Sequence, residues 1–187
     1  VANVDFSLKF LKDARNSGKP WYLYVAFNAP HAPLHALPAD YAKYKGKYDE
    51  GWDVVRATRV AKQKNIGLLP KDLKASPRPE HLPAWDAMET WRQGYEANRM
   101  TTLAAMIDRV DQEVGRLVAD LSANGELDNT LILFTTDNGT AGASYERYEK
   151  GKYIRPKVFS DINGNSVQGG KGKLNDWGTR VPLLANW

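Results

Sequence analysis

The stretch Thr130-Leu-Ile-Leu-Phe-Thr-Thr-Asp137-Asn138-Gly139 is an apolar, β-branched run that ends in a carboxylate, an amide and a glycine. A run this short, bounded by Asn129 and Gly139, predicts a strand buried on both faces. Asp137 and Asn138 follow at its carboxyl end, where open α/β sheets place their ligand sites. Two adjacent side-chain oxygens there could hold a hard cation such as Ca²⁺ or Mg²⁺, although Asp-Asn-Gly is also typical of a plain turn.

The bulk composition is that of a globular protein and excludes several classes of function. The 187 residues suit one domain or a large part of one, with 42% hydrophobic and 26% charged residues. The absence of cysteine rules out disulfides, thiolate metal sites and a cysteine nucleophile within these residues. A net charge of +4, with basic residues that look scattered among 22 acidic ones, favours small anionic ligands and gives no nucleic-acid footprint.

The ends of the sequence and its hydropathy bear on its setting. No apolar segment approaches the roughly 20 residues of a membrane span. The sequence begins without Met or a signal-peptide pattern and stops straight after an apolar run, so we expect it to be an excerpt of a longer protein.

The first part of the chain predicts a helix followed by a second strand. Residues 4–15 carry apolar side chains on one helical face, namely Phe6, Phe10, Leu11 and Ala14. The aromatic and β-branched run 21–27 predicts another buried strand. It leads into a proline-punctuated loop, 28–35, so that polar side chains again follow a strand.

The rest of the chain alternates between periodic and irregular segments. We expect helix over 40–63, a proline-rich surface connector over 70–83, and a long helix from Met100 that ends at Asn124 and Gly125. Helix and following strand then form half of a βαβ-type unit. Residues 140–168 show no period and predict a functional or mobile loop, and the final apolar run predicts a third strand.

Three histidines are candidates for acid–base chemistry. His31 follows the predicted strand 21–27, where an imidazole could donate a proton to a leaving group or bind an oxyanion. A loop histidine without a catalytic role is the alternative for His31, and that alternative is stronger for His35. We expect His81, in the proline-rich connector, to lie on the surface.

Lys171 lies in a glycine-rich segment, where backbone and ligand can approach closely and an ammonium can contact an anion. Lys173 is an equally plausible anion contact by composition. The segment is not a Walker A loop, because Gly170 stands where that motif needs its lysine and no Ser or Thr follows Lys171. A flexible loop without a ligand is the alternative.

Taken in order, these segments resemble the sulfatase family, the arylsulfatase-like branch of the alkaline-phosphatase superfamily, through nearly the whole chain. The matching segments are Ala29-Pro30-His31-Ala-Pro-Leu-His35-Ala, Tyr44-Lys-Gly-Lys-Tyr-Asp-Glu-Gly-Trp52-Asp53, Ser76-Pro-Arg-Pro79, Pro83-Ala-Trp85-Asp86, Thr136-Asp137-Asn138-Gly139, Gly170-Lys171-Gly172 and Gly178-Thr-Arg180-Val-Pro182. The resemblance implies an α/β fold, an alkaline-phosphatase-like α/β/α sandwich with a mostly parallel central sheet. Only part of it is expected over 1–187, without the amino-terminal nucleophile half and the carboxy-terminal subdomain.

The resemblance also implies roles for individual residues. Asp137 and Asn138 match the family's Asp-Asn metal ligands for Ca²⁺, or sometimes Mg²⁺. His31 matches the histidine that contacts the sulfate ester and helps to protonate the leaving group. Lys171 matches the sulfate-contacting lysine best by spacing, with Lys173 as the rival.

The nucleophile is the large departure from the family. Sulfatases use a formylglycine made from Cys or Ser in a Cys/Ser-x-Pro-x-Arg motif, and this chain contains no such motif. We therefore expect the formylglycine upstream and expect the 187 residues alone to be inactive. The implied activity is hydrolysis of sulfate esters on small molecules or carbohydrates by a periplasmic or secreted enzyme. The alternatives are a phosphatase, phosphodiesterase or phosphonate hydrolase of the same superfamily, and a non-catalytic pseudo-sulfatase or carbohydrate-binding protein.

Overall fold

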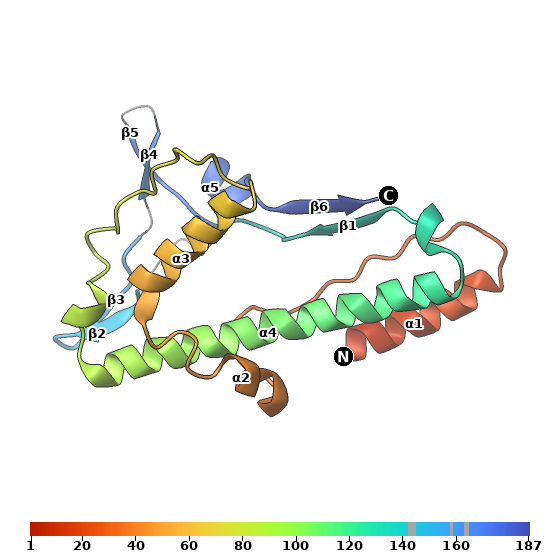
Figure 1. Ribbon diagram of the computed structural model, residues 1–187, viewed down its shortest axis with the longest axis horizontal. Helices are drawn as coiled ribbons and strands as arrows, with labels where there is room; N and C mark the ends of the chain where they lie inside the picture. The colour runs from red at the N-terminus through yellow and green to blue at the C-terminus, as the bar shows by residue number, and fades with distance from the viewer. Residues whose placement is uncertain (142–144, 158, 163–164) are drawn as a thin grey trace. The chain divides into compact units, whose positions relative to one another are not determined.

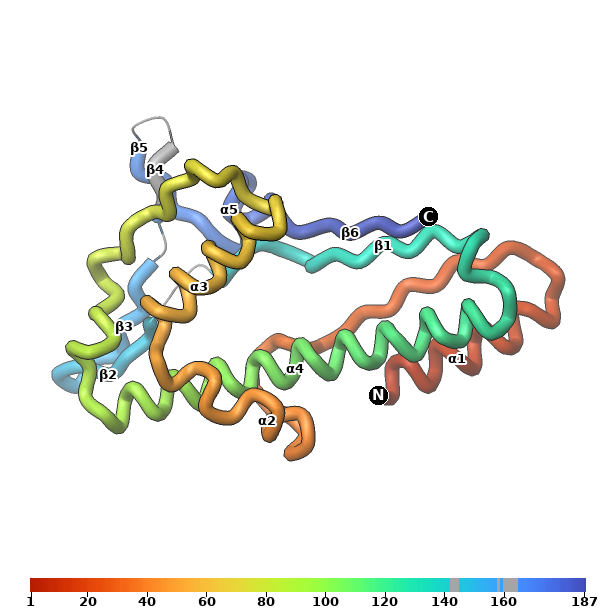
Figure 2. Tube along the Cα trace, viewed as in Figure 1, coloured from red at the N-terminus to blue at the C-terminus, as the bar shows by residue number. Residues whose placement is uncertain are grey.

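A computed structural model describes residues 1–141, 145–157, 159–162 and 165–187 of the chain (Figures 1 and 2). The chain divides into two compact units. Unit 1 comprises Val1–Ser76 and Ala84–Asp128, and unit 2 comprises Pro77–Pro83 and Asn129–Trp187. Within the described ranges, no helix is both long and apolar enough to cross a bilayer.

Unit 1 is helical and is organised around one long helix. Its elements are α1 (Ala2–Arg15), α2 (Pro38–Tyr44), α3 (Gly51–Asn65), the short 3₁₀ helix η1 (Trp85–Ala87) and α4 (Thr90–Ala123), and a further 3₁₀ turn, η2 (Leu127–Asn129), follows α4. Figure 1 shows α1 lying alongside α4, and both α1 and α2 pack against it. The core of the unit is formed by Val4, Leu11, Trp85, Ala97, Ala104, Ala105, Met106, Val110 and Leu121.

The two predicted helices at the ends of unit 1 are confirmed, with differences in detail. In α1 the buried positions are Val4, Ser7 and Leu11, whereas Phe6 and Phe10 are exposed. A single neighbouring helix covers only one stripe of α1, the stripe with i, i+3 and i+7 spacing. The long helix α4 begins ten residues before the predicted Met100, at Thr90, and ends at Ala123 as expected.

The helix predicted over 40–63 is confirmed over most of its length, but the structure divides it into α2 and α3. The break falls at 45–50, where Gly46 has a φ of +82°. That conformation is costly for residues with a Cβ, so Gly46 favours a turn over continuation of the helix. The connector predicted over 70–83 is confirmed as irregular chain.

The strand predicted over 21–27 is wrong as well. The segment forms no ladder, and unit 1 contains no strand in the part of it that the structure describes. Exposed and half-buried side chains nevertheless alternate along it, as they do in extended chain. The segment lies against α1, where the side-chain nitrogen of Asn3 donates a 2.8 Å hydrogen bond to the carbonyl oxygen of Ala26.

Unit 2 contains the strand predicted before Asp137 and Asn138. β1 (Ile132–Thr135) pairs with β6 (Leu183–Asn186), the predicted third strand, with Ile132 opposite Asn186. The pairing is antiparallel, and so are the other strand pairs of the described residues, so these pairs do not represent a mostly parallel sheet. Burial of β1 on both faces is also wrong: Leu133 is 59% exposed, because one partner strand covers an edge and not a face.

The structure contradicts the prediction of an irregular loop over 140–168. β2 (Arg147–Glu149) pairs with β3 (Lys152–Ile154), and β4 (Phe159–Ile162) pairs with β5 (Asn165–Gln168). Strands of three or four residues are too short to show a period of two, which is why the pattern missed them. Residues 142–144, 158, 163 and 164 of this segment lie outside the described residues. A one-turn helix, α5 (Asp176–Thr179), precedes β6.

Candidate active site in unit 2

Asp137 and Asn138 follow the carboxyl end of β1, as predicted. Asp137 is exposed and Asn138 is half-buried. The side-chain nitrogen of Asn138 donates a 2.8 Å hydrogen bond to the carbonyl oxygen of Gly139. This bond engages the side-chain nitrogen of Asn138 and leaves its side-chain oxygen as the atom of the amide that is suited to a cation. A side-chain oxygen of Asp137 accepts a 3.2 Å hydrogen bond from the hydroxyl of Thr136.

Two backbone hydrogen bonds fasten the glycine-rich segment beside this pair. The N–H of Gly139 donates to the carbonyl oxygen of Gly178 at 2.9 Å, and the N–H of Lys171 donates to that of Thr140 at 2.6 Å. A Cβ on Gly139 would lie 1.7 Å from the carbonyl oxygen of Trp177, so only glycine fits this approach. The structure thus places the backbone of Lys171 next to Thr140, two residues after Asn138.

The glycine-rich segment has a defined turn structure around α5. Asn175 caps α5, accepting a 3.2 Å hydrogen bond from the N–H of Trp177 and donating its amide to the carbonyl of Gln168 at 3.2 Å. The N–H of Lys173 donates to the carbonyl of Gly170 at 3.2 Å. Gly170 is buried, while Lys171 and Lys173 are exposed. The two ammonium groups are therefore accessible from solvent on a turn held at both ends.

His31 belongs to unit 1, so unit 2 by itself brings together the Asp-Asn pair and the glycine-rich segment. The N–H of His31 donates to the carbonyl of Asn28 at 2.9 Å, and its ring Nδ1 lies 2.6 Å from the carbonyl oxygen of Ala32. Because a carbonyl only accepts, Nδ1 is the donor in this contact, and Nε2 is the other nitrogen of the exposed ring. His35 is also exposed, and His81 is half-buried.

The oxygens of Asp137 and Asn138 suit a hard cation, but they account for two ligands only. Ca²⁺ takes six to eight oxygen ligands. The described residues contain no group of three or more Asp, Glu, His or Cys side chains that could hold a metal ion. The donor type fits Ca²⁺ or Mg²⁺, and the pair would supply only part of a coordination shell.

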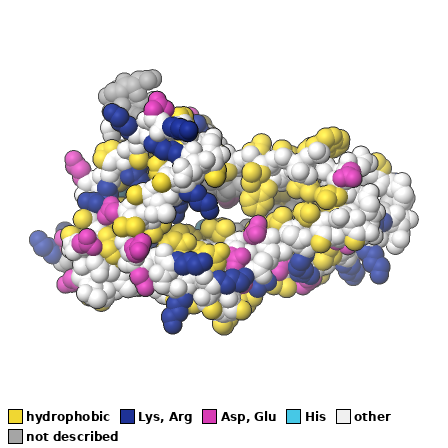
Figure 3. Space-filling view, in the orientation of Figure 1, with side chains coloured by type: hydrophobic (Ala, Val, Ile, Leu, Met, Phe, Trp, Pro, Cys, Tyr) yellow, Lys and Arg dark blue, Asp and Glu magenta, His cyan; other side chains and the backbone are white. Residues whose placement is uncertain are grey.

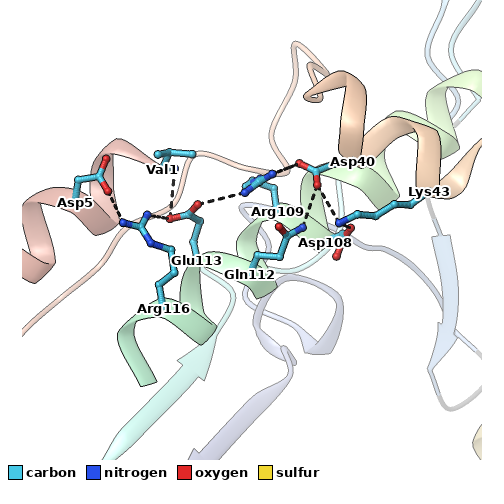
Figure 4. A network of polar contacts seen from close by, with 9 residues as sticks. All are labelled: Val1, Asp5, Asp40, Lys43, Asp108, Arg109, Gln112, Glu113 and Arg116. Atoms are coloured by element: carbon cyan, nitrogen blue, oxygen red, sulfur yellow. Dashed lines mark hydrogen bonds and ion pairs between the residues drawn. The ribbon is translucent and has the colours of Figure 1, made fainter. Parts of the chain in front are cut away.

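Sequence reasoning missed a network of buried charges that joins α1, α2 and α4 (Figure 4). Asp40, only 1% exposed, accepts hydrogen bonds from Gln112 at 3.0 Å, Arg109 at 2.8 Å and Lys43 at 3.1 Å. Burial by itself would raise the pKa of Asp40, but the hydrogen bonds from these three side chains outweigh it and lower the pKa to about 2. Lys43 also donates to Asp108 at 2.8 Å.

The second buried carboxylate of the network is Glu113, 2% exposed. Arg116 pairs with it at 2.6 Å and also reaches Asp5 on α1 at 2.6 Å, while Arg109 lies 3.6 Å away. Hydrogen bonds to these carboxylates raise the pKa of both arginines. Fully paired charges of this kind hold helices in register, and we assign them no catalytic role. Polar residues at i, i+3, i+4 and i+7 within the apolar pattern of α4 were the available sequence signal.

Comparison with known proteins settles the family. Residues 2–187 match the protein family described as Sulfatase. The chain belongs to the sulfatase family. It is 37% identical over 145 residues to an uncharacterized sulfatase of Schizosaccharomyces pombe, covering 75% of this chain and 26% of that protein. It is 36% identical over 169 residues to an arylsulfatase of Klebsiella aerogenes, covering 90% of this chain and 35% of that protein.

Two further similarities concern carbohydrates. This sulfatase chain is 29% identical over 184 residues to an N-acetylglucosamine-6-sulfatase of Capra hircus, covering 98% of the chain and 26% of that protein. A crystal structure of Ps i-CgsB in complex with k-i-k-neocarrahexaose matches it with a TM-score of 0.51 at 27% identity, covering 100% of this chain and 27% of the other. The chain thus has part of the alkaline-phosphatase-like α/β fold of the sulfatases. It spans about a quarter to a third of the length of the curated relatives.

Proposed function

We propose that this chain is the central part of the catalytic domain of a sulfuric ester hydrolase that cleaves sulfate esters on carbohydrates. The observation that carries the proposal is the pair of backbone hydrogen bonds, Gly139 to Gly178 and Lys171 to Thr140. They fasten a lysine-bearing turn beside an Asp-Asn pair, so one small region offers both cation ligands and a positive charge. A sulfate ester, with its negatively charged oxygens, is the kind of group that such a region stabilises.

Asp137 and Asn138 would hold Ca²⁺, or Mg²⁺, through a carboxylate oxygen and the amide oxygen. The bound cation would stabilise negative charge on the sulfuryl oxygens. Lys171 would add an ammonium to the same oxygens, and Lys173 is its rival for that role. His31 would protonate the departing alcohol, for which the Nε2 position is suited because Nδ1 is engaged with the carbonyl of Ala32.

The relatives and the charge of the site both support a substrate class. An N-acetylglucosamine-6-sulfatase is among the similar proteins, and a structural neighbour holds a neocarrahexaose. Two exposed lysines beside the Asp-Asn pair suit an anionic group presented on a soluble molecule. We therefore infer a sulfated carbohydrate, with a nucleophile supplied by residues outside this chain because no Cys/Ser-x-Pro-x-Arg motif is present in it.

The test is sulfate release by the full-length protein that contains this chain, with para-nitrophenyl sulfate and a sulfated N-acetylglucosamine as substrates. Lys171→Ala is expected to lower kcat/KM by about 10²–10³-fold, the usual cost of a lost charge-stabilising group. Lys173→Ala tests the rival lysine on the same turn and is expected to change kcat/KM only a few-fold. The 187 residues alone are expected to show no turnover above background.

Two outcomes would contradict the proposal. Release of phosphate from para-nitrophenyl phosphate, without release of sulfate from either ester, would favour a phosphoryl-transfer enzyme of the same superfamily. Equal activity of Lys171→Ala and the parent protein would remove Lys171 from the site.

A further inference from the structure

The excess positive charge of the chain lies in two segments. Residues 150–180 carry seven basic and two acidic residues, and they include Lys171 and Lys173 of the proposed site. Residues 54–76 carry six basic residues and one acidic residue, Asp72, and have no role so far. The remainder of the chain is acidic, with 13 basic and 19 acidic residues. The basic residues are therefore clustered, whereas a first reading of the sequence suggested that they are scattered.

The second segment lies in unit 1, and we call its basic residues the basic face. It consists of Arg56, Arg59, Lys62 and Lys64 on α3 and Lys71 and Lys74 on the loop that follows. In the space-filling view of Figure 3, basic side chains are visible around α3. From Arg56 to Lys64 the helix rises by about 12 Å.

Side chains of α3 fold the loop back along the helix. The ammonium of Lys64 donates to the carbonyl oxygens of Lys71 at 2.9 Å and Leu73 at 2.6 Å. The guanidinium of Arg56 donates to the hydroxyl of Ser76 at 2.9 Å. Because all of these partners are uncharged, the bonds hold Lys71 and Lys74 near α3 without neutralising any positive charge.

The two arginines of the basic face differ in this respect from the other arginines of unit 1. Outside the basic face, Arg15, Arg92, Arg99, Arg109 and Arg116 all form ion pairs with carboxylates. By contrast, among the ion pairs of the described residues, none includes a member of the basic face. A helix and loop that keep six cations without carboxylate partners present a strong positive potential to solvent.

We infer that the basic face binds the sulfated polysaccharide chain whose esters the proposed site cleaves. The inference rests on the proposed function, which makes the substrate a sulfated carbohydrate, and it specifies a polymer with several sulfate groups. Arginine guanidiniums suit the oxygens of a sulfate group, which they can contact through two parallel N–H bonds. Several such contacts spaced along α3 and its loop favour a chain of sulfates over a single ester.

Two other polyanions fit the basic face less well. The segment 54–76 has no aromatic residue to stack on nucleic-acid bases. An anionic membrane needs large apolar side chains among the charges on the contacting helix. The exposed uncharged residues between Arg56 and Lys62 are Ala57, Thr58 and Ala61, and the exposed Ile66 and Leu68 follow only after α3 ends.

The test compares two double variants of the full-length protein that remove the same charge. Arg59→Gln/Lys62→Gln acts on the basic face and spares Arg56 and Lys64, which hold the loop. Lys9→Gln/Lys12→Gln is the control, because it has the same spacing on the exposed side of α1. Binding to heparin, to heparin without its sulfates and to phosphatidylserine vesicles is measured over a range of salt concentrations.

The basic-face variant is expected to bind heparin about tenfold more weakly at low salt, with a shallower salt dependence. The reason is that two contacts between exposed cations and sulfate groups of heparin are lost. The control variant and kcat/KM for para-nitrophenyl sulfate are expected to stay within twofold of the parent. Three results would overturn the inference. They are equal weakening by both variants, binding of the parent protein to desulfated heparin as tight as to heparin, and tighter binding to vesicles than to heparin. Failure of the proposed function would show separately, as absence of sulfate release by the parent protein.

Discussion

The backbone N–H of Gly139 lies 2.9 Å from the carbonyl oxygen of Gly178 and donates a hydrogen bond to it. This bond joins the end of β1 to α5, and it brings the residue after Asn138 against the carbonyl of Trp177. No side chain can be accommodated between the two segments. The geometry of the proposed site therefore depends on a glycine that carries no chemistry itself.

Gly139→Ala is expected to destabilise the protein by about 1–3 kcal/mol, since its Cβ would overlap the carbonyl oxygen of Trp177. Gly115→Ala is the matched control, because Gly115 lies inside α4 with nothing within 4 Å of its added Cβ. There the change is expected to stabilise the helix by up to about 1 kcal/mol. Urea denaturation measures both, and the same sign for the two variants would refute the close approach.

Calcium is expected to raise the melting temperature of the full-length protein through Asp137. A ligand at 100 times its dissociation constant stabilises a folded protein by about 2.7 kcal/mol. Asp137→Ala should lose most of this effect, whereas Asp128→Ala, at another exposed aspartate, should keep it. Calorimetry with calcium and with a chelator measures the difference. An undiminished calcium response in Asp137→Ala would exclude the carboxylate as a ligand.

Asp40 makes the stability of unit 1 depend on acid pH. Its pKa of about 2 in the folded protein lies below the ordinary 3.8. The ionised carboxylate therefore contributes its full stabilisation above pH 3.8, and this contribution is lost as the pH falls toward 2. The difference corresponds to about 2 kcal/mol. Unfolding free energies measured across this range should fall less steeply in Asp40→Asn than in the parent, and Asp49→Asn, at an exposed aspartate, should follow the parent.

Arg109 compensates two buried carboxylates at once, so its loss is expected to be costly. Arg109→Leu removes the 2.8 Å contacts with Asp40 and the 3.6 Å contact with Glu113. A buried charge that loses a partner typically costs about 3 kcal/mol or more. Arg99→Leu, on the same helix, removes a pair with Glu96, which keeps Arg92 as a second partner, and should cost less than about 1 kcal/mol. Equal costs in thermal or chemical unfolding would show that the network contributes nothing beyond surface pairing.

Sequence patterns predicted the helices better than the strands. The period of apolar residues in α1 and α4 extends over several turns and outweighs local irregularities. The segment 21–27 has the composition of a strand but forms none, because a strand exists only through its partner. The short strands from β2 to β5 were missed, since three or four residues carry too little pattern to identify.

The sequence by itself determined where the long helices form, that a strand ends at Asp137 and Asn138, and that the chain resembles the sulfatases. These conclusions depend on local periodicity, turn chemistry and the order of short motifs. Only the tertiary structure decided that Gly139 meets Gly178, that Lys171 is fastened to Thr140, and that Asp40 is enclosed by α4. Each of these contacts joins residues that are distant in the chain, and no local pattern encodes which distant residue will supply the partner. The run into Asp137 and Asn138 thus predicted two candidate cation ligands, and the fold placed the backbone of the predicted Lys171 close to them.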